Sequence, residues 1–451
     1  MRRLHRGLLA ATLLVVPGLA TAEVTGSTTT IFRFFDLRHD RPEVESVRTY
    51  RPLDQHVRLN WSDLGAKDRW EIDLHARGRV DLATGQRGGE DELQVLLAEA
   101  TWRRPSGKLS VHLGRQRSLT GLGWRAFDGV KVQGRPNSHV HLFGSLGFPV
   151  ELGENESSDT DGLTYAGGLR LRLAKTGSFG LDYERREFDG KVREETAGAD
   201  LELRLGRVQV HANADYSLLL DRFGETAVVA SFSPAPRHHV EGRVLRVQPI
   251  LPADSIFVVF TSNPVTEQRV AYTYRTDKGL SLGTYFLHAN YEDTDVPGPE
   301  DLDRAAVTAS YRGPGVRKTK HRGEIGWQSG FSGDRLAARY DVDFDLNPRW
   351  RLGGGAAVNR YENRYRLDDS DQVVALRSRL TYRWRQRFEL AMSLEQFFGR
   401  DRDNLRGSVV VRTLLGKARQ QRPWWQGGFD EGWVSRPAES RERPVVERGA
   451  Q

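Results

Sequence analysis

Apolar and polar residues alternate along most of the chain from about residue 24 onward. In the segment 70–77, Trp, Ile, Leu and Ala alternate with Glu, Asp, His and Arg. The same period of two recurs in the segments 169–173, 208–218, 340–346 and 376–384. A period of two places successive side chains on opposite faces of a β-strand. The pattern predicts an all-β protein whose strands carry one apolar face and one polar face.

The length of the alternating runs indicates the kind of sheet. Several runs extend over about 10 to 13 residues. Strands of globular proteins usually have about 5 or 6 residues, whereas a tilted strand that crosses an outer membrane needs about 9 to 11. The composition does not change between residues 24 and 415, and a continuous sheet of that size has to close to remove its edges. We therefore expect a single-chain transmembrane antiparallel β-barrel.

Short polar or Gly/Pro-containing turns separate the runs at fairly regular intervals. We expect ten of these turns, near Ala66, Ser106, Pro136, Thr176, Gly206, Ala235, Lys278, Pro314, Asn347 and Arg385. More variable connections lie between them, at 36–55, 80–91, 147–160, 248–268, 293–302 and 363–370. Short periplasmic turns and longer extracellular loops are typical of outer-membrane barrels. Ten short turns with one further strand at each end predict 22 strands, within a range of about 18 to 24.

Tryptophan placement gives an independent indication of a membrane boundary. Five tryptophans lie within about five residues of the expected short turns, namely Trp61, Trp70, Trp102, Trp350 and Trp384. Amphipathic rings favour the boundary between membrane and water, where the indole N–H is hydrated. We therefore expect an aromatic girdle at the periplasmic rim.

Both ends of the chain fall outside the expected barrel. Residues 1–22 combine three arginines, an apolar stretch from Leu8 to Leu19 and an Ala-Thr-Ala site before Glu23, which is the pattern of a cleaved signal peptide. We expect the barrel to span 23–416 and a periplasmic, disordered, tryptophan-containing tail to span 417–451. Removal of the signal peptide lowers the formal charge from +7 to +4, because it removes three arginines and no acid. A charge this close to neutral does not indicate a nucleic-acid partner.

Candidate catalytic and metal-binding groups are sparse. The chain has no cysteine, which excludes disulfides, thiolate metal sites and covalent haem attachment. It also lacks the common nucleophile, phosphate-binding and metalloprotease motifs. The adjacent pair His238 and His239 lies on an expected strand, where neighbouring side chains point to opposite faces and share a metal poorly. We expect no enzymatic activity, no metal and no cofactor.

Charged residues on the polar faces are the candidate pore lining. A charge on the lipid face near the membrane midplane costs several kcal/mol, so these side chains are expected to point inward. The basic candidates are Arg170, Arg172, Arg377, Arg379 and Arg383, and the acidic candidates are Glu71, Asp73, Asp341 and Asp343. One interpretation is a solvated lumen in which opposite charges screen each other. The other is a basic strip that favours anionic solutes.

Two apolar segments are candidates for occluding the lumen or binding a partner. A barrel of about 22 strands is wide enough to need a plug or a guest, and no globular plug precedes the first expected strand. Loop 248–268 carries Phe257 and Phe260 in an apolar run that favours burial, although a short extra strand explains it equally well. The tail contributes Trp424, Trp425, Phe429 and Trp433.

The stretch 97–134 resembles a known family. It contains Leu-Ala-Glu-Ala-Thr-Trp at 97–102, Leu-Gly-Arg-Gln at 113–116 and Phe-Asp-Gly-Val at 127–130. This succession is similar to one found in Gram-negative outer-membrane porin-like β-barrels, including alginate-export-type porins. The resemblance implies a pore-forming envelope protein, and it carries over no alginate site.

These observations predict an outer-membrane channel for passive passage of hydrophilic solutes, with a small hydrophilic or anionic molecule and an exported polysaccharide chain as the candidate solutes. The expected surroundings are outer-membrane lipid and lipopolysaccharide, and insertion requires the barrel assembly machinery. The alternative is a structural sheath for a periplasmic or lumenal protein partner, such as a multihaem cytochrome conduit or a polysaccharide-export machine. The wide lumen and the tryptophan-rich tail suit this alternative.

Overall fold

The computed structural model describes residues 23–41, 44–64, 69–83, 92–120, 123–150, 161–173, 176–248, 264–292, 301–313, 318–330, 333–362, 370–385, 387–399 and 404–416. Within these residues every regular element is a β-strand. The described residues include no helix with the length and apolar character that a membrane crossing requires. The predicted signal peptide, the tail with Trp424, Trp425, Phe429 and Trp433, and the loop residues Phe257 and Phe260 lie outside the described residues.

The strands follow one another along the chain as a continuous meander. The first half contains β1 (Glu23–Arg41), β2 (Val44–Tyr50), β3 (Pro52–Leu64), β4 (Trp70–Asp81), β5 (Glu92–Arg103), β6 (Leu109–Thr120), β7 (Gly123–Gly134), β8 (Val140–Pro149), β9 (Gly162–Leu173), β10 (Gly177–Phe188), β11 (Lys191–Leu205) and β12 (Val208–Ser217). The second half contains β13 (Arg222–Ala235), β14 (His238–Val247), β15 (Val265–Arg275), β16 (Leu280–Tyr291), β17 (Asp301–Arg312), β18 (Thr319–Gly330), β19 (Gly333–Asp345), β20 (Trp350–Glu362), β21 (Ser370–Trp384), β22 (Phe388–Phe398) and β23 (Asn404–Leu415).

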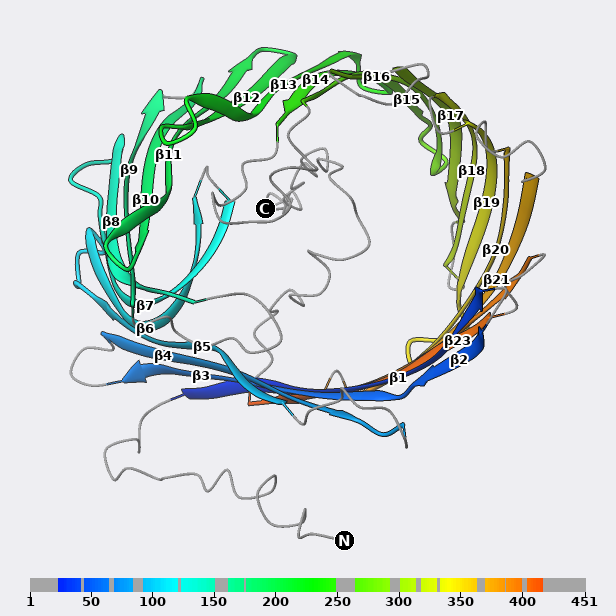
Figure 1. Cartoon of the computed structure of the whole chain (residues 1–451), viewed down its shortest axis with the longest axis horizontal. Coiled ribbons are helices and arrows are strands. Elements are labelled where there is room, and N and C mark those ends of the chain that lie inside the picture. The colour runs from blue at the N-terminus through cyan, green and yellow to red at the C-terminus, as the bar shows by residue number, and fades with distance from the viewer. Residues whose placement is uncertain are drawn as a thin grey trace, which may run out of the picture.

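The sheet closes into a barrel (Figure 1). Its wall has 22 strand positions, as predicted. Each strand except β2 pairs antiparallel with the strand that follows it in the sequence, and β1 also pairs with β23 from Gly26↔Leu415 to Phe35↔Arg406. The 23 strands count as 22 around the wall because β2 and β3 pair in succession with the same strand, β1. Closure satisfies the backbone groups of the two edges, which an open sheet in a membrane leaves unpaired.

The turns alternate between two rims. All ten positions predicted for short turns lie at or between consecutive strand ends, beginning with β3–β4 and ending with β21–β22. We call this the short-turn rim. The longer predicted connections at 80–91, 147–160, 248–268, 293–302 and 363–370 join strand ends at the other rim, the long-loop rim. The expected connection 36–55 is different, because β1 and β2 continue as a paired ribbon up to Arg41↔Val44.

Phe34 and Gly407 meet at the seam where the barrel closes. They are direct register partners on β1 and β23, and a Cβ atom at position 407 would overlap the Phe34 ring. The ring therefore covers a backbone that has no side chain of its own, which is a known way to stabilise glycine in sheets.

We expect Phe34→Ala to lower the free energy of unfolding by about 1 kcal/mol, the upper range for a cross-strand pair. Phe32→Ala is the matched control because Phe32 lies on the same strand opposite Val409 rather than a glycine. Urea unfolding of detergent-folded protein measures both variants. Equal losses would show that the ring on Gly407 has no special role.

Candidate functional site

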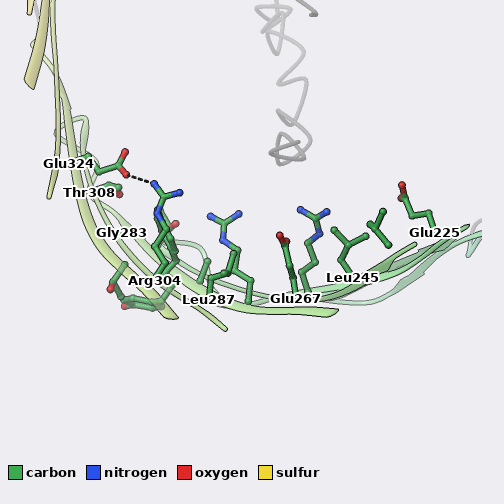
Figure 2. Close-up of a pocket in the computed structure, with 16 residues that line it drawn as sticks. Glu225, Leu245, Glu267, Gly283, Leu287, Arg304, Thr308 and Glu324 are labelled. Carbon is green, nitrogen blue, oxygen red and sulfur yellow. Dashed lines mark ion pairs between the residues drawn. The ribbon is translucent and has the colours of Figure 1, made fainter. Parts of the chain in front are cut away.

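The two faces of the wall differ sharply in chemistry. On β15, β17 and β18, the apolar residues Val270, Val307 and Ile325 are 60%, 61% and 64% exposed. Charged neighbours in the same strands, such as Arg304 and Glu324, point to the concave side (Figure 2). Contiguous exposed apolar surface needs a nonaqueous partner, and a band of it around a closed barrel faces lipid. The described exterior is therefore that of an outer-membrane barrel.

Aromatic side chains mark the short-turn rim of this exterior. Trp70 and Trp102 are direct partners on β4 and β5, and Trp350 lies 4.5 Å from Tyr382 between ring centroids. Trp384 is 48% exposed at the end of β21. Trp61, the fifth predicted girdle residue, is opposite the exposed Ile72. The five tryptophans thus lie where a membrane–water boundary is expected.

The predicted acidic pair on β4 belongs to a hydrogen-bonded cluster on the lumenal face. The Asn60 side-chain amide on β3 donates to Glu71 at 2.7 Å and to Asp73 at 2.9 Å. Arg103 on β5 forms an ion pair with Glu71 at 2.5 Å. Asn60 is only 7% exposed, so its two acceptors hold it in place.

The predicted arginines of β21 are mostly neutralised by acids on neighbouring strands. Arg377 forms an ion pair with Glu395 and lies 3.9 Å from Asp341. Arg383 pairs with Glu389 at 2.6 Å. Arg379 is exposed and forms no ion pair with a described residue. Asp343 lies in register with Lys320 on β18. This part of the wall therefore carries mixed charge rather than a strip of one sign.

The predicted arginines of β9 lie on the opposite side of the ring from β21 (Figure 1). Arg170 pairs with Asp200 at 2.7 Å, and Arg172 is exposed near the short-turn rim. The sequence-predicted basic residues thus form two separate groups. Exposed ion pairs of this kind contribute about 0 to 1 kcal/mol each, so their main effect is on the potential inside the lumen.

A hairpin that leaves the wall was missing from the sequence prediction. β5 pairs with β6 only up to Ala98↔Arg115, and β7 pairs with β8 only up to Phe127↔Pro149. β6 and β7 nevertheless pair with each other as far as Thr120↔Gly123. The last part of β6, residues 116–120, and the first part of β7, residues 123–126, turn into the ring (Figure 1). We call this segment the inner hairpin.

Gly114 and an ion pair form the hinge of the inner hairpin. Gly114 has φ +104°, and a Cβ there would overlap the carbonyl oxygen of Ala98. The next residue, Arg115, donates from Nε and Nη2 to the two carboxylate oxygens of Asp128, both at 2.8 Å. Its Nη1 donates to the carbonyl oxygen of Val95 on β5 at 2.8 Å. The bidentate pair is a strong charge-assisted arrangement that joins the two hairpin strands, and the bond to Val95 ties them to the wall strand β5.

The inner hairpin lies over polar rather than apolar side chains. Gln116 is 1% exposed and donates to the carbonyl oxygens of His112 and Gly129 at 3.1 and 3.0 Å. Arg117 is close enough to His75 on β4 to interact with it electrostatically. His75 is buried and shares a 3.3 Å ring-nitrogen contact with His56. These polar neighbours hold the hairpin by specific hydrogen bonds and electrostatic interactions rather than by apolar packing.

A recess interrupts the lumenal wall between β13 and β18. It has a volume of about 690 Å³, and its side chains rise from the concave face of the sheet (Figure 2). The charged lining residues are Glu225, Arg243, Glu267, Arg269, Arg304 and Glu324. In the described part of the chain no three His, Asp or Glu side chains gather as a metal site would require.

Comparison with known proteins supports no assignment to a family. No family model matches the sequence, and no curated protein is significantly similar to it. Several solved structures resemble the chain in shape. The P pilus usher PapC translocation pore is 7% identical, with 87% of this chain and 100% of that chain covered and a TM-score of 0.46. Acinetobacter baumannii OccAB3 is 9% identical, with 87% and 99% covered and a TM-score of 0.44. A BenF-like porin from Pseudomonas fluorescens Pf-5 is 8% identical, with 88% and 100% covered and a TM-score of 0.43.

Proposed function

We propose that this protein is a non-enzymatic outer-membrane channel for passive passage of small hydrophilic solutes, narrowed by the inner hairpin. The observation that carries the proposal is the division of the closed wall into an apolar exterior and a densely charged lumenal face. Charged walls stay hydrated, and a hydrated lumen passes polar solutes. Outer-membrane lipid and lipopolysaccharide then surround the exterior, and the barrel assembly machinery inserts it.

Small solutes, including anionic ones, suit this lumen better than an exported polysaccharide. The inner hairpin stands inside the ring, and the hydrogen bond from Arg115 to Val95 on β5 ties it to the wall, so a polymer chain has to pass beside a fixed obstacle. The exposed Arg172 and Arg379 add positive potential without a paired acid among the described residues. We expect a modest preference for anions, because most other lumenal arginines are paired.

The inner hairpin also weighs against the alternative, a sheath around a partner protein. A large guest would compete with the hairpin for the same space. The tail 417–451 is the remaining candidate for contacting a periplasmic partner. Truncation after Gly416 is expected to leave conductance unchanged and to abolish co-purification of any such partner.

Single-channel conductance in a planar bilayer tests the proposed function. We expect steady conductance from the folded mature chain and, in a KCl gradient, a reversal potential that indicates weak anion selectivity. Arg379→Gln should reduce that selectivity slightly, because it removes one unpaired lumenal charge. A bilayer that stays silent with correctly folded protein would contradict the channel and favour a sealed barrel or a sheath.

A further inference from the structure

The recess between β13 and β18 is lined by side chains from six successive strands. Short residues such as Ala271 and Gly283 line it beside long ones such as Arg269 and Leu287. The result is a concave, water-accessible site rather than a smooth stretch of wall.

Positive charge is concentrated on one side of the recess. Arg243 on β14 and Arg269 on β15 are direct register partners on the lumenal face. Like charges placed directly opposite each other in a sheet are destabilising. Arg269 forms no ion pair with a described residue, and its Nε is buried without a hydrogen-bond partner. A buried donor without an acceptor costs free energy, so Arg269 is already held at some cost, and an anionic ligand at the two guanidinium groups would relieve the repulsion between them.

Tyr285 holds the guanidinium of Arg269 in place. The Arg269 Cζ lies 4.6 Å from the Tyr285 ring centroid, and the Arg304 Cζ lies 5.6 Å from the same centroid. Arg304 is also within 3.6 Å of Glu324. Stacking on an aromatic ring restricts a guanidinium to one orientation while its edge stays available for a carboxylate. Arg269 is thus a pre-organised donor whose partner is missing among the described residues.

Glu267 supplies an acceptor next to this donor. It precedes Arg269 by two residues, so both side chains are on the same face of β15. Both line the recess, and Figure 2 shows Glu267 rising into it. Glu267 forms no hydrogen bond or ion pair with a described residue. An ionised carboxylate can only accept. It therefore suits a ligand that carries a hydroxyl or ammonium group close to its own carboxylate.

We propose that the recess is a binding subsite for small carboxylates that carry a hydrogen-bond donor on a neighbouring carbon. The ligand carboxylate pairs with Arg269, and the ligand donor binds Glu267. The subsite rests on the proposed function, because solutes reach it through the lumen. The subsite goes beyond the proposed function, because it makes the channel select among hydrophilic solutes by specific binding to wall residues rather than by size alone.

Saturation-transfer NMR of the folded mature chain in detergent tests this subsite directly. Gluconate is the probe, sorbitol is the matched compound without a carboxylate, and acetate is the matched compound without a hydroxyl. We expect gluconate to bind, and sorbitol and acetate to bind at least about tenfold more weakly, because each loses one charge-assisted hydrogen-bonding contact.

Variants separate the role of Arg269, which binds the ligand carboxylate, from that of Glu267, which binds the ligand donor. Arg269→Gln should weaken gluconate about tenfold or more, and Arg269→Lys should weaken it less, because it keeps the charge but loses the planar fork. Glu267→Gln should weaken gluconate and leave acetate unchanged or tighter. Arg379→Gln is the matched control, since it removes an unpaired lumenal arginine from the distant strand β21. Heat-modifiable gel mobility shows whether each variant has folded.

The outcomes distinguish this inference from the proposed function. Gluconate affinity that is equal in Arg269→Gln and Arg379→Gln would overturn the subsite, as would equal binding of sorbitol and gluconate. Conductance without gluconate binding would refute the subsite and keep the channel. Specific gluconate binding by a barrel that conducts nothing would keep the subsite and refute the channel.

Discussion

Asp128→Ala is expected to raise single-channel conductance severalfold without disturbing the paired strands of the barrel wall. In the wild-type protein the Asp128 carboxylate accepts two hydrogen bonds from Arg115. The Arg115 side chain is only 14% exposed. Removing one partner of a partly buried ion pair weakens the compensation of the remaining charge, a change that costs about 3–5 kcal/mol at a fully buried site and less here. Without Asp128 the Arg115 guanidinium is no longer oriented towards Val95 on β5, so the hairpin loses this tie to the wall and leaves its fixed position in the pore for part of the time.

Trypsin cleavage provides the structural measurement for the same variant. Arg117 projects from the inner hairpin, so release of the hairpin should speed cleavage there while the wall remains resistant. Glu202→Gln is the control because it breaks the Arg204–Glu202 pair, whose side chains are 57% and 46% exposed at the short-turn rim. We expect it to change neither readout. Faster cleavage of Asp128→Ala without a change in conductance would show that the hairpin does not narrow the pore.

The barrel could be predicted from the sequence because its rules are local. Alternation sets which side chain points outward, and Gly/Pro-containing turns set where each strand ends. The strand number and the ten short turns could therefore be predicted from the sequence pattern. The inner hairpin was not predicted, because a segment that loses one neighbouring strand still keeps its strand conformation. One signal was present. Three polar residues, Arg115, Gln116 and Arg117, stand in succession where a wall strand alternates.

The pore lining was harder to predict than the fold because it depends on register between strands. Alternation places Arg170 and Arg377 inside, but their partners Asp200 and Glu395 are 30 and 18 residues away. Only the pairing of neighbouring strands decides which charges meet. The recess was missed for the same reason. Its key feature is that Arg269 contacts Tyr285 on the next strand, a relation between two hairpin strands that neither segment shows alone.

Val307→Arg is expected to destabilise the folded barrel by about 2–4 kcal/mol, the cost of an arginine on the lipid face near the bilayer midplane. Val307 lies in the middle of β17 and is 61% exposed on the apolar exterior. Its neighbour Thr308 stands at the same height but lines the lumenal recess. Thr308→Arg is therefore the matched control, with the same new side chain placed in water. Urea unfolding in lipid vesicles measures both variants.

The difference between the two losses in free energy of unfolding, rather than either loss alone, tests which face of β17 points to lipid and which to the lumen. Both substitutions disturb the same strand and replace a β-branched residue, so their effects on strand propensity are similar. What remains is the transfer of a guanidinium into hydrocarbon for one variant and into a hydrated lumen for the other. Equal destabilisation would mean that the exterior of β17 does not contact lipid. A larger loss for Thr308→Arg would place the apolar face inside and would contradict both the membrane assignment and the channel.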